Sequence, residues 1–231
     1  MKFSGLDLLS LTFLVPAAAN ADEVFIYTPV KHATFVVRSG PATIYVDPIG
    51  ETADFSGFLP PDLILITHIH KAHLDPKLVE VLKQEQTQII GPATVVAQLG
   101  YGSPLGNGET TSAFGLTIEA IAAYNTSAEQ LSFHPKGRDN GYLISKAGVR
   151  LYVSGDTEDI KEMLTLRDID IAFLCMNLPY TMTIEQAASA VKTFKPKRVI
   201  PYHYRGTAGM SDIASFERLA TGSKVSKLKW Y

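Results

Sequence analysis

The sequence predicts a mixed α/β protein, and three observations lead to this fold class. Apolar runs of strand length alternate with amphipathic helix patterns along the 231-residue chain. One pattern occurs twice, at residues 42–68 and 149–175. It consists of a strand that ends in an acid, a crossover, and a second apolar strand that begins with Asp. Three of the six histidines fall between residues 68 and 73, directly after the buried-strand pattern 62–66. Two similar halves that meet at their strand ends would form a shared cleft.

The first half of the chain is expected to hold five strands and two helices. The strands are predicted at residues 24–27, 33–38, 43–46, 62–66 and 87–90. The first helix has Asp75 as N-cap and Pro76 at its first position, and it runs to about residue 86. The second covers residues 93–99 and ends at Gly100. Loops are expected at residues 50–61 and 101–111.

The second half is expected to hold six strands and three helices. The strands are predicted at residues 116–124, 141–145, 149–153, 169–175, 197–201 and 225–230. A short helix is predicted at residues 160–166, and Thr183 with Gln186 forms a capping box for a helix that runs to residue 194. Ser211 or Asp212 caps the last helix, which Gly222 stops. The loop 125–140 is long enough to be functional.

Length and composition indicate one globular domain, which we place at residues 22–231. Hydrophobic residues make up 46% of the chain and charged residues 19%, which excludes a disordered protein. The formal net charge of -2 gives no electrostatic reason to expect nucleic acid or an anionic membrane as partner. A small-molecule substrate is expected instead, and the oligomeric state is left open.

Residues 1–21 have the pattern of an export signal. Lys2 provides a basic start, residues 8–19 are an apolar stretch, and Ala19-Asn20-Ala21 is a small-x-small cleavage pattern before Asp22. The apolar stretch is shorter than the roughly 20 residues that a membrane span needs. We therefore expect an exported protein, periplasmic or secreted, whose mature chain begins near Asp22 and has no membrane span. An uncleaved N-terminal helix is the alternative.

The histidine cluster His68, His70 and His73 is the strongest functional signal. Period-2 geometry turns His68 and His70 the same way if the extended backbone persists, and the following turn can bring His73 back from another side. Neutral imidazole is the commonest protein ligand for zinc and related ions. The alternative is three solvated loop histidines, or one core histidine with two neighbours. The position directly after a buried strand favours a metal site.

Three further residues lie in a loop or just beyond a strand end, where the same cleft could collect them. They are His134, Asp156 and His203, and Gly155 permits the tight bend before Asp156. Alternatively, Asp156 is a turn residue that caps the next helix, and His203 is a satisfied loop histidine. Five histidines and one acid are enough for one metal ion or two.

The order of five motifs resembles the metallo-β-lactamase superfamily of metal-dependent hydrolases. The motifs are Tyr45-Val46-Asp47-Pro48, Thr67-His68-Ile69-His70-Lys71-Ala72-His73-Leu74-Asp75, Phe133-His134-Pro135-Lys136-Gly137, Ser154-Gly155-Asp156-Thr157 and Pro201-Tyr202-His203-Tyr204. The likeness runs from about residue 24 to 205. Within the superfamily, the chain is similar to the branch of ascorbate phosphate lactonases and N-acyl phosphatidylethanolamine phospholipases. This similarity rests on His73-Leu74-Asp75 and Asp156-Thr157.

This resemblance implies a four-layer αββα sandwich with the site along one edge. It implies a first metal site of His68, His70 and His134, and a second with His73 and His203, Asp156 bridging the two. Members of the superfamily use a metal-bound hydroxide to hydrolyse esters, lactones, amides, thioesters or phosphodiesters.

The chain departs from the family pattern at Ala72, where relatives usually have an Asp that binds the second ion. A methyl group cannot bind metal, and two divalent ions offset only by Asp156 and one hydroxide would keep a net positive charge. We therefore expect one tightly bound ion and a weakened second site. Zn²⁺ is the expected ion, since three histidines and a water are a recognised catalytic zinc arrangement. Mn²⁺ and Fe²⁺ are alternatives. Asp75 could replace the missing acid, but its N-cap role is the favoured interpretation.

Supporting roles are assigned to further residues near the expected site. Asp156 could orient or deprotonate the nucleophilic water, and His203 could stabilise the oxyanion or protonate the leaving group. Asp47 resembles an acid that steers a ligand histidine, and Asp75 and His32 are placed in the same supporting layer, with a core position for His32 equally open. Asn125 and Lys136 could touch substrate. Cys175, the only cysteine, is expected to be a small core residue rather than a ligand.

The leading hypothesis is therefore an exported metal-dependent hydrolase. The alternative from another class is a member of the same fold that binds metal or ligand without turnover because of Ala72. A phosphodiesterase or nuclease is a third possibility, although the lack of basic surface argues against long nucleic acid. A β-lactam hydrolase is the fourth.

Overall fold

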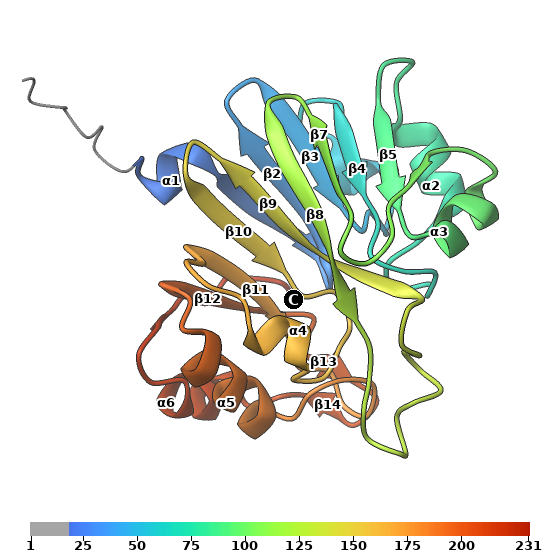
Figure 1. Ribbon diagram of the computed structural model, residues 1–231. Helices are drawn as coiled ribbons and strands as arrows, with labels where there is room; N and C mark the ends of the chain where they lie inside the picture. The colour runs from blue at the N-terminus through green and yellow to red at the C-terminus, as the bar shows by residue number, and fades with distance from the viewer. Residues whose placement is uncertain (1–18) are drawn as a thin grey trace, which may run out of the picture.

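Two β-sheets face each other and carry helices on their outer sides, as the computed structural model in Figure 1 shows for residues 19–231, which are the residues described. The first sheet has the order β1 (Ile26–Lys31), β2 (Thr34–Ser39), β3 (Ala42–Val46), β4 (Leu63–Leu65), β5 (Gln88–Gly91) and β6 (Ser103–Pro104). The second has the order β15 (Lys224–Val225), β12 (Arg198–Tyr202), β11 (Ile171–Cys175), β10 (Val149–Val153), β9 (Asp139–Lys146), β8 (Leu116–Ala123) and β7 (Thr110–Ala113). A separate hairpin pairs β13 (Arg205–Gly206) with β14 (Gly209–Met210). The expected four-layer αββα sandwich is confirmed.

Strand periodicity explains how the first sheet separates two cores. In β3, Ile44 and Val46 join the core between the sheets, whereas Tyr45 points to the core under the helices of the first half. In β4, Leu63 and Leu65 likewise join the core between the sheets, and Ile64 joins the core under the helices. Successive side chains of a strand point to opposite faces, so strands buried on both sides must be apolar at every position. The continuous apolar runs of the sequence have this cause.

The helices cover the outer faces of the sheets. The first half contributes α2 (Pro76–Leu82) and α3 (Ala93–Leu99), and the second α4 (Lys161–Leu164), α5 (Ile184–Phe194) and α6 (Ile213–Leu219). Two short helices, α1 (Ala21–Val24) and the 3-10 helix η1 (Thr52–Phe55), precede β1 and β4. The predicted capping box of α5 is confirmed, with Thr183 Oγ1 accepting from Gln186 N at 3.1 Å. Asp212, rather than Ser211, caps α6.

Several element boundaries differ from the sequence predictions. The strand expected at residues 24–27 begins only at Ile26, because residues 21–24 form α1. The helix expected to reach residue 86 ends at Leu82, and the last helix ends at Leu219 before Gly222. The final strand expected at residues 225–230 is confined to Lys224–Val225, because Trp230 turns inward and donates from Nε1 to the Pro201 carbonyl at 2.8 Å. Tertiary packing here overrides the alternating pattern.

The internal repeat is present in the hydrogen bonding. Asp62 Oδ2 accepts from the Thr43 N–H at 2.8 Å, and Asp170 Oδ2 accepts from the Arg150 N–H at 2.8 Å. Each acid locks the start of a parallel strand pair, β3 with β4 and β10 with β11. The sequence pattern predicts Asp168 as the repeated acid, and this prediction is wrong, because Asp170 makes the equivalent hydrogen bond.

Candidate metal centre

The histidine cluster follows β4 as a tight turn. The His70 carbonyl accepts from the N–H groups of His73 and Leu74, at 2.8 and 2.9 Å. This turn reverses the chain and brings His73 back toward His68, with ring centroids 3.9 Å apart. The expectation that His73 returns from another side is confirmed.

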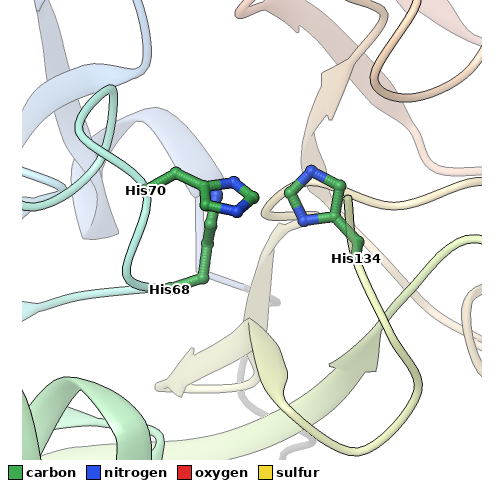
Figure 2. Close-up of side chains that lie close together, drawn as sticks. All are labelled: His68, His70 and His134. Atoms are coloured by element: carbon green, nitrogen blue, oxygen red, sulfur yellow. The ribbon is translucent and has the colours of Figure 1, made fainter. Parts of the chain in front are cut away.

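His134 approaches the cluster from the loop before β9. Figure 2 shows its ring facing those of His68 and His70 across the gap between the two halves. Its centroid lies 4.9 Å from that of His68 and 4.8 Å from that of His70. One nitrogen from each of the three rings lies within 4.8 Å of the others. The structure therefore brings together the three residues expected to form the first metal site.

Asp139 orients the His134 ring. Nδ1 of His134 lies 3.0 Å from Asp139 Oδ2, and because a carboxylate can only accept, Nδ1 carries the hydrogen. Nε2 is left with a free lone pair and lies 3.5 Å from Asp156 Oδ2. Arg138 holds the Asp139 carboxylate through Nε and Nη2, at 2.7 and 2.8 Å. A buried carboxylate behind a histidine is a common support for metal ligands.

Asp47 plays the same part for the other half of the cluster. Its Oδ2 lies 2.7 Å from His73 Nδ1 and accepts from Thr67 Oγ1 at 2.7 Å. Since Thr67 donates its hydroxyl hydrogen to Asp47, it accepts from His68 Nδ1 at 2.9 Å. His68 therefore presents a free Nε2 lone pair to the interior, whereas Nε2 of His73 lies 3.0 Å from Nε2 of His203. Asp47 thus contacts His73, one of the histidines that the sequence analysis expects to bind metal.

Asp156 lies at the centre of the site. Its Oδ2 is 3.2 Å from His203 Nε2, 3.5 Å from the Nε2 atoms of His73 and His134, and 3.9 Å from that of His68. Gly155 makes this position possible, with a φ of +61 and a Cβ site only 2.6 Å from the Asn140 carbonyl oxygen. Any side chain at this position would clash with β9.

His203 completes the second half of the site. Its Nε2 lies 3.0 Å from His73 Nε2 and 3.0 Å from Asn177 Nδ2. Thr181 donates to Asn177 Oδ1 at 2.7 Å and so fixes the amide. His32 packs edge-on against His203 at 4.1 Å between centroids, and its Nδ1 contacts the Tyr231 hydroxyl at 2.9 Å. All six histidines of the chain thus gather at one end of the sandwich.

Burial and charge set the protonation of the site. Burial is the largest cause that lowers the pKa of His68 well below its usual value, and it lowers the pKa of His70 to about 4. Burial also acts against protonation of His73, but the charges of Asp156 and Asp47 outweigh it and raise the pKa of His73 to about 10. Burial raises the pKa of Asp156, but His203 and His73 outweigh it and hold that pKa well below its usual range. The space between Asp47 and Asp156 therefore favours a positive charge.

The donor set fits a metal ion. Buried polar atoms are almost always hydrogen-bonded, yet His68 Nε2, Asp156 Oδ1 and His203 Nδ1 are buried without a partner among the described residues. Two of these residues belong to sets of side chains whose ligand atoms lie within 4.8 Å of one another. The sets are His68 with His70 and His134, and His68 with His73 and Asp156. Imidazole nitrogen and carboxylate oxygen suit zinc and related divalent ions.

A pocket of about 360 Å³ opens onto these residues. Ala72 lines it, at the position where the resemblance to the superfamily leads us to expect an acid. Phe133 and Tyr180 supply apolar walls and contact each other edge-on at 5.0 Å between centroids. A volume above about 300 Å³ is typical of small-molecule sites.

Asp75 and Cys175 have the N-cap and core positions favoured from the sequence, whereas Asn125 and Lys136 bind neighbouring protein groups. Asp75 Oδ1 accepts from the N–H groups of Lys77 and Leu78 as the N-cap of α2, and makes no hydrogen bond or ion pair with a described site histidine. Asn125 Nδ2 ties the Gln130 and Tyr180 carbonyls together, and Lys136 contacts Tyr124 and Glu162 away from the histidine pocket. Cys175 is a core residue, and burial raises the pKa of its thiol to about 12.

Sequence reasoning missed several residues that support the site. They are Thr67, Arg138, Asp139 and Asn177, together with the carboxylate of Glu158. An acid five residues after His134 was the only available signal for Asp139. The other residues gain their roles from contacts between distant segments, which carry no local pattern.

The part of the chain from residue 19 onward contains no helix long and apolar enough to cross a membrane. The proposed export signal lies almost wholly outside the described residues.

Comparisons with known proteins identify the family. The family model described as a β-lactamase superfamily domain matches residues 28–203. A UPF0173 metal-dependent hydrolase of Thermodesulfovibrio yellowstonii is 30% identical, over 94% of this chain and 92% of that protein. The crystal structure of a metal-dependent hydrolase of Parabacteroides distasonis is 42% identical over 89% of this chain and 94% of that chain, with a TM-score of 0.83. Igni18, a metallo hydrolase of Ignicoccus hospitalis, is 26% identical over 88% of this chain and 94% of that chain, with a TM-score of 0.75. The chain therefore belongs to the metallo-β-lactamase superfamily of metal-dependent hydrolases, in the UPF0173 family.

Proposed function

We propose that this protein is an exported hydrolase that holds one tightly bound divalent ion on His68, His70 and His134. It cleaves an ester, lactone, amide or phosphodiester bond of a small molecule. The observation that carries this proposal is the orientation of the rings. The Nδ1 hydrogens of His68 and His134 are committed to Thr67 and Asp139, so both Nε2 lone pairs face the same buried space.

The residues of the chain would divide the chemistry as follows. A divalent ion bound here supplies Lewis acidity and lowers the pKa of a water molecule. Asp156, ionised and with a buried oxygen free of hydrogen bonds, would orient the attacking water and accept its proton. His203, whose Nε2 lies 3.2 Å from Asp156 Oδ2, would stabilise the oxyanion or protonate the leaving group.

Zinc is the metal we favour, with manganese and iron as alternatives. The three-histidine donor set supports zinc, although imidazole also binds iron. Ala72 removes an acid from the second half of the site, which leaves His73, His203 and Asp156 to bind a second ion weakly. We keep the likeness of the sequence to ascorbate phosphate lactonases and N-acyl phosphatidylethanolamine phospholipases as a proposal about the branch.

Metal analysis combined with a substrate panel tests this function. The purified protein is assayed for bound metal, with and without supplied zinc or manganese. It is then tested on aryl esters, lactones, amides, bis-aryl phosphodiesters and a chromogenic β-lactam. Tight binding of one ion and metal-dependent turnover of one class would support the proposal. Bound metal without turnover of any class would favour the alternative, a member of the fold that binds metal or ligand without catalysis.

Export is proposed on the N-terminal sequence. Cleavage after Ala21 would leave Asp22 in the mature chain, where its carboxylate pairs with Arg198 of β12, with Oδ2 and Nη2 2.8 Å apart. Mass spectrometry of the protein from a periplasmic or culture fraction tests this. A mature N-terminus at or near Asp22 is expected, and an intact Met1 in the soluble cell fraction would contradict it.

A further inference from the structure

Arg205 is a cation at the pocket that has no acidic partner. It is exposed, it belongs to β13, and it lines the histidine pocket together with His32 and Tyr180. Among residues 19–231, no carboxylate forms an ion pair or hydrogen bond with its guanidinium group. The neighbouring cations differ, since Lys31 is paired with Asp54 at 3.1 Å and Arg138 with Asp139 at 2.7 Å.

Tyr231 holds the Arg205 side chain in place. The guanidinium carbon lies 4.1 Å from the centroid of the Tyr231 ring, in a cation–π contact. The Tyr231 hydroxyl accepts from the backbone N–H of Arg205 at 3.3 Å and contacts His32 Nδ1 at 2.9 Å. Trp230, buried and bonded to the Pro201 carbonyl, fixes this end of the chain. Stacking uses one face of the guanidinium and leaves its N–H edge free for a ligand.

The hairpin that carries Arg205 is firmly docked. A Cβ on Gly206 would lie 1.6 Å from the Leu178 carbonyl oxygen, so only glycine allows this close approach. Thr207 N donates to the same carbonyl at 3.2 Å, and Ser211 Oγ donates to the Met176 carbonyl at 2.5 Å. The segment that supplies Asn177 and Tyr180 to the pocket therefore also positions Arg205. Such preorganisation lowers the entropic cost of binding.

The charge around the pocket is unbalanced. Among the described residues that line it, Asp156 is the only acid, and the Nε2 atoms of four histidines lie 3.2 to 3.9 Å from its Oδ2. A bound metal ion would add further positive charge at the inner end. A neutral substrate would leave Arg205 without a counterion, whereas an anionic group would be recognised through charge-assisted hydrogen bonds to the planar guanidinium.

We propose that Arg205 binds an anionic group of the substrate, a carboxylate or a phosphate, separate from the bond that is cleaved. The substrate class of the proposed hydrolase is then a small anionic ester, lactone, amide or phosphodiester. This inference rests on the proposed function for its catalytic part, but the binding of the anion does not require turnover.

Calorimetric titration with two unreactive anions, glutarate and inorganic phosphate, tests binding directly. The metal-loaded wild type is compared with Arg205→Gln and with Arg218→Gln, which removes an exposed arginine that does not line the histidine pocket. Arg205→Gln should weaken binding of the preferred anion about tenfold, the effect of one charge-assisted hydrogen bond, while Arg218→Gln should bind as wild type does. The anion that loses more affinity identifies the carboxylate or the phosphate as the natural group. Equal affinities in wild type and Arg205→Gln for both anions would overturn the inference.

A matched pair of esters tests the consequence for specificity. The kcat/KM for the anionic ester para-nitrophenyl hydrogen glutarate is divided by the same constant for neutral para-nitrophenyl butyrate. We expect this ratio to fall about tenfold in Arg205→Gln, mainly because KM rises for the anionic ester, and to recover in part in Arg205→Lys. An unchanged ratio would count against Arg205 even if both esters are hydrolysed. If neither ester is hydrolysed, the proposed function is in question while the titrations still decide the role of Arg205.

Discussion

Asp47 Oδ2 lies 2.7 Å from His73 Nδ1 at a position where neither side chain is exposed to solvent. The same carboxylate accepts from the backbone N–H and the hydroxyl of Thr67, both at 2.7 Å. One buried acid thus fixes the residue before His68 and the ring of His73. It joins the end of β3 to the cluster after β4, so the metal centre and the first sheet depend on the same contacts.

Replacing this acid should destabilise the protein. Asp47→Asn removes the charge that His73 and Thr67 share, and we expect a loss of about 2–4 kcal/mol in the free energy of unfolding. Asp54→Asn is the control, because its ion pair with Lys31 is solvent-exposed and contributes about 1 kcal/mol or less. Urea unfolding of the three proteins measures both effects. Similar losses in the two variants would show that Asp47 has no special structural role.

His68 and His134 should be equally necessary for tight binding of the metal ion. His68→Ala and His134→Ala each remove one of three converging nitrogens, so tight metal binding should be lost in either variant. Metal content after dialysis, measured by mass spectrometry, checks this. His32→Ala should retain the ion, since its ring contacts Tyr231 and His203 rather than the His68, His70 and His134 set. If His134→Ala keeps full metal content, that residue does not bind the ion.

Ala72 should limit the second ion. Ala72→Asp puts a carboxylate at the pocket wall near His73 and should raise the metal content from about one toward two ions per chain, because it offsets the charge between the ions. Titration with zinc against a competing chelator measures both affinities. Ala72→Asn, which adds bulk without charge, is the matched control. Two equally tight ions in the wild type would disprove the single-ion proposal.

Glu158 should couple the stability of the His134 loop to pH. Its buried carboxylate accepts from the Ser127 N–H at 2.7 Å and from the Thr126 hydroxyl at 2.9 Å, at the start of the loop that carries His134. Burial raises the pKa of Glu158, but hydrogen bonds from Ser127 and Thr126 outweigh it and lower that pKa. Because the folded pKa lies below the unfolded one, the carboxylate stabilises the protein above the unfolded pKa of about 4.3, and this stability is lost as pH falls through the folded value.

Glu158→Gln is therefore expected to be less stable than wild type at pH 7, by about 1–3 kcal/mol, with the difference shrinking below about pH 4. Unfolding curves at several pH values measure this difference, and Glu129→Gln on the exposed part of the same loop should show none. A difference that stays constant down to pH 3 would mean that the ionised carboxylate contributes nothing. Metal content at pH 7 should also fall if the loop moves His134.

The sequence predicted most of the fold because its signals are local. Buried strands, the Asp75 N-cap, the Thr183 capping box and the Gly100 stop depend on residues within a few positions of one another. The predictions failed where distant contacts decided the outcome. Residues 226–230 alternate as a strand would, but the burial of Trp230 against Pro201 draws the segment out of the sheet.

The sequence by itself determined the chemistry of the site: five histidines and one acid, placed in loops or just after strand ends, with Ala72 inside the cluster. Only the tertiary structure decided how these groups are used. It set Asp139 behind His134, gave Asp75 to the end of α2, and stacked Arg205 on Tyr231 beside the pocket. The physical reason is the distance along the chain over which each kind of interaction acts. Strand alternation and helix capping act between chain neighbours, whereas the direction of an imidazole lone pair or the lack of a counterion depends on side chains that meet only when the two sheets pack together.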